Sequence, residues 1–198
     1  MTILGRPRGF DRDAALQTAM LVFWRKGYSE TSINDLCDAM GIRSPSLYAA
    51  FGSKESLYIE SLEHYNKTVR PLVWGRLGDD APVRDCMEQF LLAAASILPG
   101  YADAPRGCMA TLAAIVDDSP GDLPEAIKSA RLDGLDLLRL RLEAAVTEGE
   151  LPRSTNVDRL SRFYLSVFQG MAIQARDGAT QADLEGMAEA AMCAWPGD

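Results

Sequence analysis

The segment 32–51 has room for only two short helices, which Gly41 separates. Hydroxyl residues precede the first helix and can cap it, and its apolar positions repeat at helical spacing: Ile33, Leu36, Cys37 and Met40. Ser44 can cap the second helix, with Pro45 in its first turn, where a missing N–H costs nothing. Two short helices joined by a tight glycine turn are the helix-turn-helix layout.

Helical patterns also occupy the rest of the chain, and Gly and Pro separate them. A first helix is expected over residues 11–27 and a fourth from Lys54 to about Val73. Beyond residue 75 no strand signal is strong enough to place a sheet, and helices are expected at Val83–Leu98, Arg106–Asp117, Leu123–Glu148, Val157–Ala175 and Gln181–Ala194. We therefore expect an all-α fold of about nine helices. A three-helix N-terminal unit with a basic arm (residues 1–54) precedes a C-terminal helical domain (residues 55–198).

The charges are distributed unevenly along the chain. The formal net charge is −8, but residues 1–70 carry nine Lys and Arg against eight Asp and Glu, a balance of +1. The other 128 residues carry eleven against twenty, a balance of −9. Such asymmetry is expected when only the N-terminal end of a chain meets the phosphates of DNA, although acidic solvated helix faces are also common.

Several other classes of protein are not indicated. No apolar run reaches the roughly eighteen residues of a membrane helix, and the basic, polar start does not resemble a secretory signal. We therefore expect a cytoplasmic protein, associated with the nucleoid when bound to DNA, and no membrane partner. The four Cys are far apart and His64 is the only His, so we expect no disulfide framework, metal site or cofactor. No catalytic motif is present, and we expect no enzyme activity.

The second short helix has the side chains that a recognition helix needs. Short polar or flat side chains reach base edges while the opposite side of the helix packs inside. Here Leu47 and Phe51 are expected to face inward. The residues predicted to contact DNA are Arg6, Arg8, Thr31, Ser32, Arg43, Ser44, Ser46, Leu47, Tyr48 and Lys54. Arg6 and Arg8 lie in the basic arm, which can enter a minor groove or remain solvated.

The stretch GYSETSINDLCDAMGIRSPSLYAAFGSKESLY, residues 27–58, resembles the DNA-binding signature of the TetR family. The resemblance implies that Tyr48 and Lys54 contact the DNA backbone, that Thr31 caps or contacts phosphate at the first short helix, and that Arg43, Ser44 and Ser46 lie in the major groove. It also implies a double-stranded palindromic operator, a homodimer and a small-molecule effector. Repression is the usual mode in this family, and activation stays open, as does a DNA-binding scaffold without a small-molecule ligand.

The last two helices are the predicted dimer contacts. The segment Phe168 to Thr180 is similar to the end of the penultimate helix in many TetR-family regulators, in which the last two helices form a four-helix bundle across the dimer axis. The predicted interface residues are Phe163, Val167, Met171, Leu184, Met187 and Ala191. The alternative is that these residues form an internal core with no partner.

A ligand cavity between the middle helices is a further implication of the resemblance. The predicted walls are Trp74, Phe90, Met109, Leu112, Tyr164 and Phe168. Apolar, aromatic walls suit a small hydrophobic or aromatic effector, and the alternative is ordinary core packing.

Cys108 is a candidate redox or electrophile sensor. It follows Arg106-Gly107 at the start of a predicted helix, where the helix dipole and a nearby cation can stabilise a thiolate. The Arg-Gly-Cys triplet resembles one in a group of TetR-type regulators, some of which sense electrophiles or oxidants. The alternative is a small buried apolar cysteine.

Overall fold

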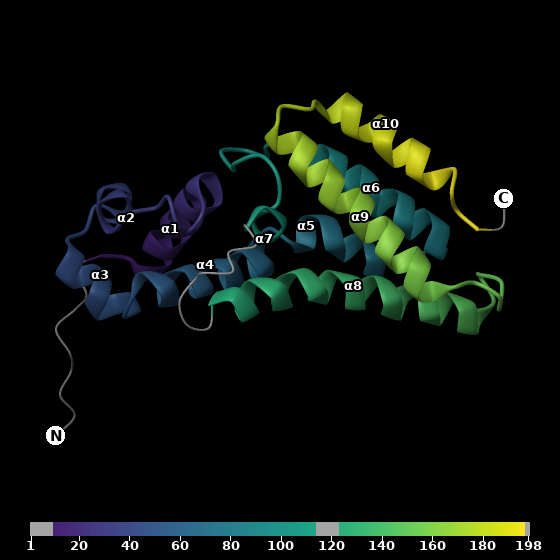
Figure 1. Cartoon of the computed structure of the whole chain (residues 1–198), viewed down its shortest axis with the longest axis horizontal. Helices are drawn as coiled ribbons and strands as arrows, with labels where there is room; N and C mark the ends of the chain where they lie inside the picture. Colours follow the sequence, from purple (N-terminus) through teal and green to yellow (C-terminus); the bar gives the residue numbers. More distant parts are fainter. Residues whose placement is uncertain (1–9, 114–122, 197–198) are drawn as a thin grey trace, which may run out of the picture.

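The computed structural model describes residues 10–113 and 123–196. The molecule is elongated, with α1 (Arg12–Lys26), α2 (Ile33–Met40) and α3 (Ser44–Phe51) at one end (Figure 1). α4 (Lys54–Thr68) runs from this end toward the other helices, and it packs on α1 and on α8. The expected all-α fold is confirmed, because the described residues form helices and no strands.

Specific caps define the first helices. The Asp11 side chain accepts hydrogen bonds from two backbone N–H groups at the start of α1, and Ser32 forms a reciprocal capping box with Asp35 at the start of α2. Gly41 ends α2 with φ of 64°, in the left-handed region that L-residues with a side chain avoid. The chain can therefore turn sharply from α2 into α3.

The second half of the molecule is a helical bundle. Its long helices are α6 (Val83–Ile97), α8 (Leu123–Glu148), α9 (Val157–Arg176) and α10 (Gln181–Met192). α10 packs on α6 and α9, and α8 packs on α9. No helix in the described part of the chain combines the length and apolarity required to cross a membrane.

An aromatic cluster fills the centre of this bundle. The Trp74 ring lies with its centroid 4.8 Å from Phe90 and 5.0 Å from Phe168. Gly134 of α8 allows this packing, because a Cβ there would lie 2.6 Å from the Trp74 ring. The cluster thus occupies space in which the sequence suggested a ligand.

Two predicted helices are shorter in the structure. The fourth helix ends at Thr68 rather than near Val73, because Pro71 lacks an N–H and cannot continue it. The chain instead forms the single turn α5 (Pro71–Trp74) and the 3-10 turn η1 (Gly75–Gly78). The helix expected at 106–117 is the single turn α7 (Met109–Leu112), and residues 114–122 lie outside the described part.

Candidate nucleic-acid interface

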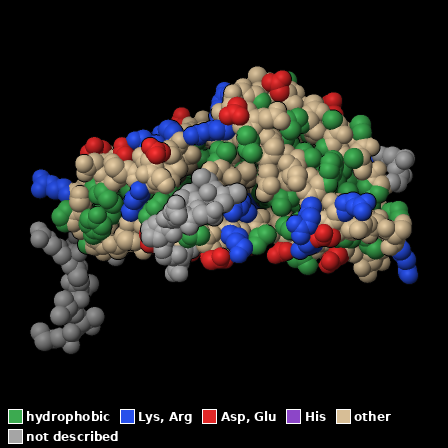
Figure 2. Space-filling model, in the orientation of Figure 1, with side chains coloured by type: hydrophobic (Ala, Val, Ile, Leu, Met, Phe, Trp, Pro, Cys, Tyr) green, Lys and Arg blue, Asp and Glu red, His purple; other side chains and the backbone are tan. Residues whose placement is uncertain are grey.

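α3 presents a polar face to solvent at the end of the molecule. Pro45, Ser46, Tyr48 and Ala49 are exposed, and Arg43, which precedes the helix, is exposed as well. Figure 2 shows a basic side chain extending from the end of the molecule that α2 and α3 form. The opposite side of α3 is buried, since Leu47 has no exposed surface and Phe51 only 4%. The helix therefore has one packed side and one side free for a partner.

Arg12 of α1 fixes the C-terminal end of α3. Its guanidinium donates to both carboxylate oxygens of Glu60, at 2.9 and 2.7 Å, and to the carbonyl oxygen of Ala50, at 3.3 Å. The same group lies 4.5 Å from the centroid of the Phe51 ring. Arg12 thus joins α1, α3 and α4. No local sequence pattern indicates this role, because Arg12 is 38 residues from Ala50 and 48 from Glu60.

The turn before α2 is closed by two polar contacts. The Thr31 hydroxyl is buried and donates to the Gly27 carbonyl oxygen at 2.6 Å. The Asp35 carboxylate accepts from Lys26 at 2.6 Å and from Ser32. The Lys26 hydrogen bond, followed by those from Ser32, holds the pKa of Asp35 well below its usual range. Ser32 itself is exposed and lies at the N-terminus of α2, where phosphate oxygens are favoured.

Lys54 lies at the first position of α4, on the same end of the molecule as α3. Its ammonium is 4.3 Å from the centroid of the Tyr28 ring, and partial burial lowers the pKa of Lys54. The ring holds the cation at the helix N-terminus, where backbone N–H groups also attract anions.

The structure sorts the predicted DNA contacts into three groups. Arg43, Ser44, Ser46, Tyr48, Lys54 and Ser32 are at least partly exposed around α3. The prediction that Leu47 contacts DNA is wrong, because its side chain is fully buried in the core. The Thr31 side chain is buried in the turn before α2. Arg6 and Arg8 lie outside the described residues.

The predicted dimer residues divide between the surface and the core. Phe163 is 39% exposed, and Val167 and Met187 are partly exposed. The prediction of a dimer contact is wrong for three residues that are buried against other helices of the same chain: Met171, Leu184 and Ala191. Ile173, which is 50% exposed on α9, was missed. Hydrophobic side chains lie at the surface in the half of the molecule that contains α9 and α10 (Figure 2).

The six predicted pocket residues do not enclose one cavity. Trp74 and Phe168 line a void of about 20 Å³, which is room for about one water molecule. Met109 and Leu112 line a different cavity. Phe90 and Tyr164 are fully packed, and the Tyr164 hydroxyl donates to the Ala191 carbonyl oxygen at 3.3 Å. The prediction of a common pocket is wrong because most of these aromatic rings pack against one another.

Cys108 is 4% exposed and lies beside the small void. The Tyr65 hydroxyl donates to its sulfur at 3.3 Å. The prediction that a helix dipole activates the Cys108 thiol is wrong, because α7 is a single turn and has few aligned peptide units.

A short helix with one exposed polar face, packed behind a second helix at the end of an all-α molecule, defines the helix-turn-helix class of DNA-binding proteins. Family models match both parts of the chain. Residues 15–60 match the model described as "Bacterial regulatory proteins, tetR family". Residues 87–191 match the model described as "Tetracyclin repressor-like, C-terminal domain". The chain belongs to the TetR family of transcriptional regulators.

Individual relatives agree with this assignment. The HTH-type transcriptional repressor ComR of Escherichia coli K12 is 34% identical over 194 residues, which cover 97% of this chain and 92% of ComR. A cysteine mutant of the TetR family regulator CifR, complexed with 26 bp double-strand operator DNA, has a TM-score of 0.90 at 37% identity. The match covers 97% of this chain and all of that one. Like these relatives, the chain is a DNA-binding regulator and not an enzyme.

Replacing Arg12 with Ala should lower the free energy of unfolding by about 1–2 kcal/mol, because a partly buried charged pair and a carbonyl contact are lost. Operator affinity should fall as well, since the end of α3 is no longer fixed. Urea unfolding and DNA titration measure the two effects. Arg153→Ala, at an exposed Arg in the loop between α8 and α9, is the control. Equal stability and affinity in the two variants would contradict the assigned role.

Proposed function

We propose that this protein is a repressor that binds a palindromic operator as a homodimer and leaves it when a small hydrophobic or aromatic effector binds. The observation that carries the proposal is the exposed polar face of α3 opposite the buried Leu47. The similarity to ComR, a transcriptional repressor, and to CifR, which forms a complex with operator DNA, supports it. Residues 1–54 are assigned to DNA reading and residues 55–198 to dimerisation and effector response.

The residues around α3 have different roles in this proposal. Arg43, Ser44 and Ser46 reach base edges in the major groove, where donor and acceptor patterns distinguish the base pairs. Tyr48, which is 48% exposed, and Lys54 contact phosphates and set the register of the helix. The N-terminus of α2 at Ser32 adds a phosphate site. Arg6 and Arg8 of the arm follow the backbone or the minor groove.

Dimerisation follows from the size of the reading helix and from the surface of α9. One helix of eight residues gives few base contacts, so two copies on adjacent half-sites are needed for operator specificity. Phe163, Val167 and Ile173 lie on the outer side of α9, and Met187 lies beside it on α10. Gly170 lies between them and lets a partner helix approach closely. This face can bury its apolar surface against a second copy.

Lys54→Ala should weaken binding to any DNA sequence and reduce the slope of log affinity against log salt by about one, because one phosphate contact is lost. Fluorescence anisotropy at several salt concentrations measures both quantities. Lys67→Ala is the matched control, because this Lys of the same helix is 76% exposed and lies near its other end. The docking geometry is wrong if the two variants have the same affinity and slope.

Ile173→Glu should give monomers, because two-fold symmetry places the new charge twice in the buried interface. Light scattering after size exclusion should report 21.6 kDa for this variant and twice that mass for the unmodified protein. Leu72→Glu, at a residue of α5 that is 40% exposed, is the control. An Ile173→Glu dimer, or an unmodified protein that is monomeric at micromolar concentration, would exclude this interface.

A second candidate function is the sensing of electrophiles through Cys108. The Tyr65 hydroxyl donates a hydrogen bond to the Cys108 sulfur, and the thiolate is the nucleophilic form of a cysteine. Burial raises the pKa of Tyr65 well above its ordinary value, so this phenol remains a donor. Arg70 also lines the void beside the sulfur, and its Nη2 lacks a partner there.

Iodoacetamide tests the reactivity of Cys108, because the thiolate displaces iodide and forms a carbon–sulfur bond. Mass spectrometry should show faster modification of Cys108 in the unmodified protein than in Tyr65→Phe at neutral pH. The exposed Cys193 is the internal reference and should react equally in both. Slow modification of Cys108 at the same rate in both proteins would exclude the sensor role.

A further inference from the structure

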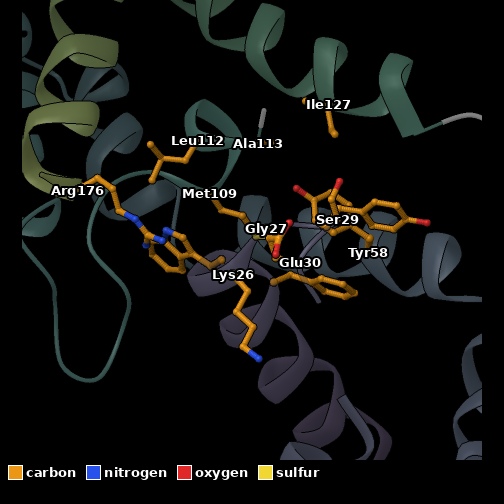
Figure 3. A pocket seen from close by; sticks show the side chains of 13 residues that line it. Lys26, Gly27, Ser29, Glu30, Tyr58, Met109, Leu112, Ala113, Ile127 and Arg176 are labelled. Carbon is orange, nitrogen blue, oxygen red and sulfur yellow. The ribbon is translucent and has the colours of Figure 1, made fainter. Parts of the chain in front are cut away.

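A cavity of about 380 Å³ lies at the junction of the two parts of the molecule, among the described residues. The end of α1, the turn at residues 27–30 and Tyr58 of α4 form one side of it. Residues of α7, Ile127 of α8 and Arg176 of α9 form the other side. Figure 3 shows Arg176 and Tyr58 on opposite sides, with Met109 and Leu112 between them. A molecule bound here would touch both the DNA-reading helices and the C-terminal helices.

The walls of this junction cavity suit a flat, mainly apolar molecule. Phe23, Met109, Leu112 and Ile127 supply apolar surface. Trp24 also lines the cavity and is only 5% exposed, yet its indole N–H has no acceptor. Buried N–H donors are usually hydrogen-bonded, and one without an acceptor destabilises the folded state. A ligand that supplies an acceptor oxygen would restore this hydrogen bond.

The charges around the cavity favour an anion. Arg176 and Lys26 are cationic, and Glu30 is the one acidic side chain among the described lining residues, so their balance is +1. Lys26 is already paired with Asp35 at 2.6 Å, which leaves Arg176 as the cation available to a ligand. Burial raises the pKa of Tyr58 to about 12, so its hydroxyl is neutral and adds a donor instead of a negative charge.

Arg176 also connects the two parts of the molecule. It is the last residue of α9, and its guanidinium donates to the carbonyl oxygen of Arg25 in the last turn of α1. Carbonyl groups at a helix C-terminus have no partner within the helix, so this contact satisfies one of them. An acceptor in the cavity would compete with Arg25 for the same guanidinium.

We propose that the junction cavity is the effector site and that it binds a small planar aromatic anion, a carboxylate or a sulfonate. The anionic oxygens accept hydrogen bonds from Trp24 and Arg176, and the aromatic body packs against Leu112 and Ile127. Arg176 then leaves the Arg25 carbonyl, and the DNA-reading helices are no longer held in one orientation. This inference rests on the proposed repressor function, because a ligand lowers operator affinity only if it prefers the released arrangement.

The test uses 8-anilinonaphthalene-1-sulfonate, an aromatic sulfonate with a planar naphthalene ring that fluoresces in apolar surroundings, with the full-length protein. The first measurement is operator binding without the probe, on a duplex selected from a random pool. No sequence-specific binding there means that the proposed function fails. If the unmodified protein binds the duplex, the probe should bind the protein and weaken operator affinity. Absence of probe binding, or binding with no effect on the operator, overturns the effector site alone.

Three variants locate the probe. Arg176→Gln should weaken probe binding about tenfold, the effect of losing one charge-assisted hydrogen bond, and should lower operator affinity without the probe. Leu112→Trp should prevent probe binding by filling the cavity. Arg159→Gln, at the other end of α9, is the control and should behave as the unmodified protein. Equal probe binding in all of these proteins means that the cavity is only a solvent-filled junction, and the proposal is overturned.

Discussion

The burial of one side of α3 determines which of its residues face solvent and can read DNA. A helix of eight residues is unstable in isolation, because few hydrogen bonds offset the entropy of its nucleus. Leu47 and Phe51 therefore stabilise α3 through the core, and Arg12 fixes its end through Glu60 and the Ala50 carbonyl. Because these contacts permit one rotation of the helix, the residues on its other side, Ser46 and Tyr48 among them, face solvent.

Two contacts connect the DNA-reading helices to the C-terminal bundle. α4 packs on both α1 and α8 and so connects the two parts. Arg176 forms a second link at the end of α1. The junction cavity lies between these links, whereas the aromatic cluster of Trp74, Phe90 and Phe168 fills the middle of the bundle. A ligand at the junction can therefore change the orientation of α1 without repacking the core.

Local features were predictable from the sequence, and long-range contacts were not. Caps, glycine turns and apolar spacing predicted α2 and α3, and the inward side of α3 was correct. The predicted Ser44 cap was wrong, because Ser44 is already the first residue of α3 and Arg43 precedes it without a side-chain cap hydrogen bond. The Arg176 contact joins residues 151 positions apart, and no local pattern indicates it. On α9 the apolar residues form a broad band, and their spacing does not show which of them pack in the core, as Met171 does, and which remain at the surface, as Phe163 does. Aromatic residues suggested a pocket where the structure has close packing.

The most direct measurement of the central claim is a hydroxyl-radical footprint of the unmodified protein on a duplex that it selects from a random pool. If two copies of α3 read one face of the DNA, the footprint has two equivalent protected segments. Their centres should be separated by about 10–10.5 base pairs or a multiple of this distance. A single protected segment, or two segments on opposite faces of the duplex, would contradict this account of how the protein reads DNA.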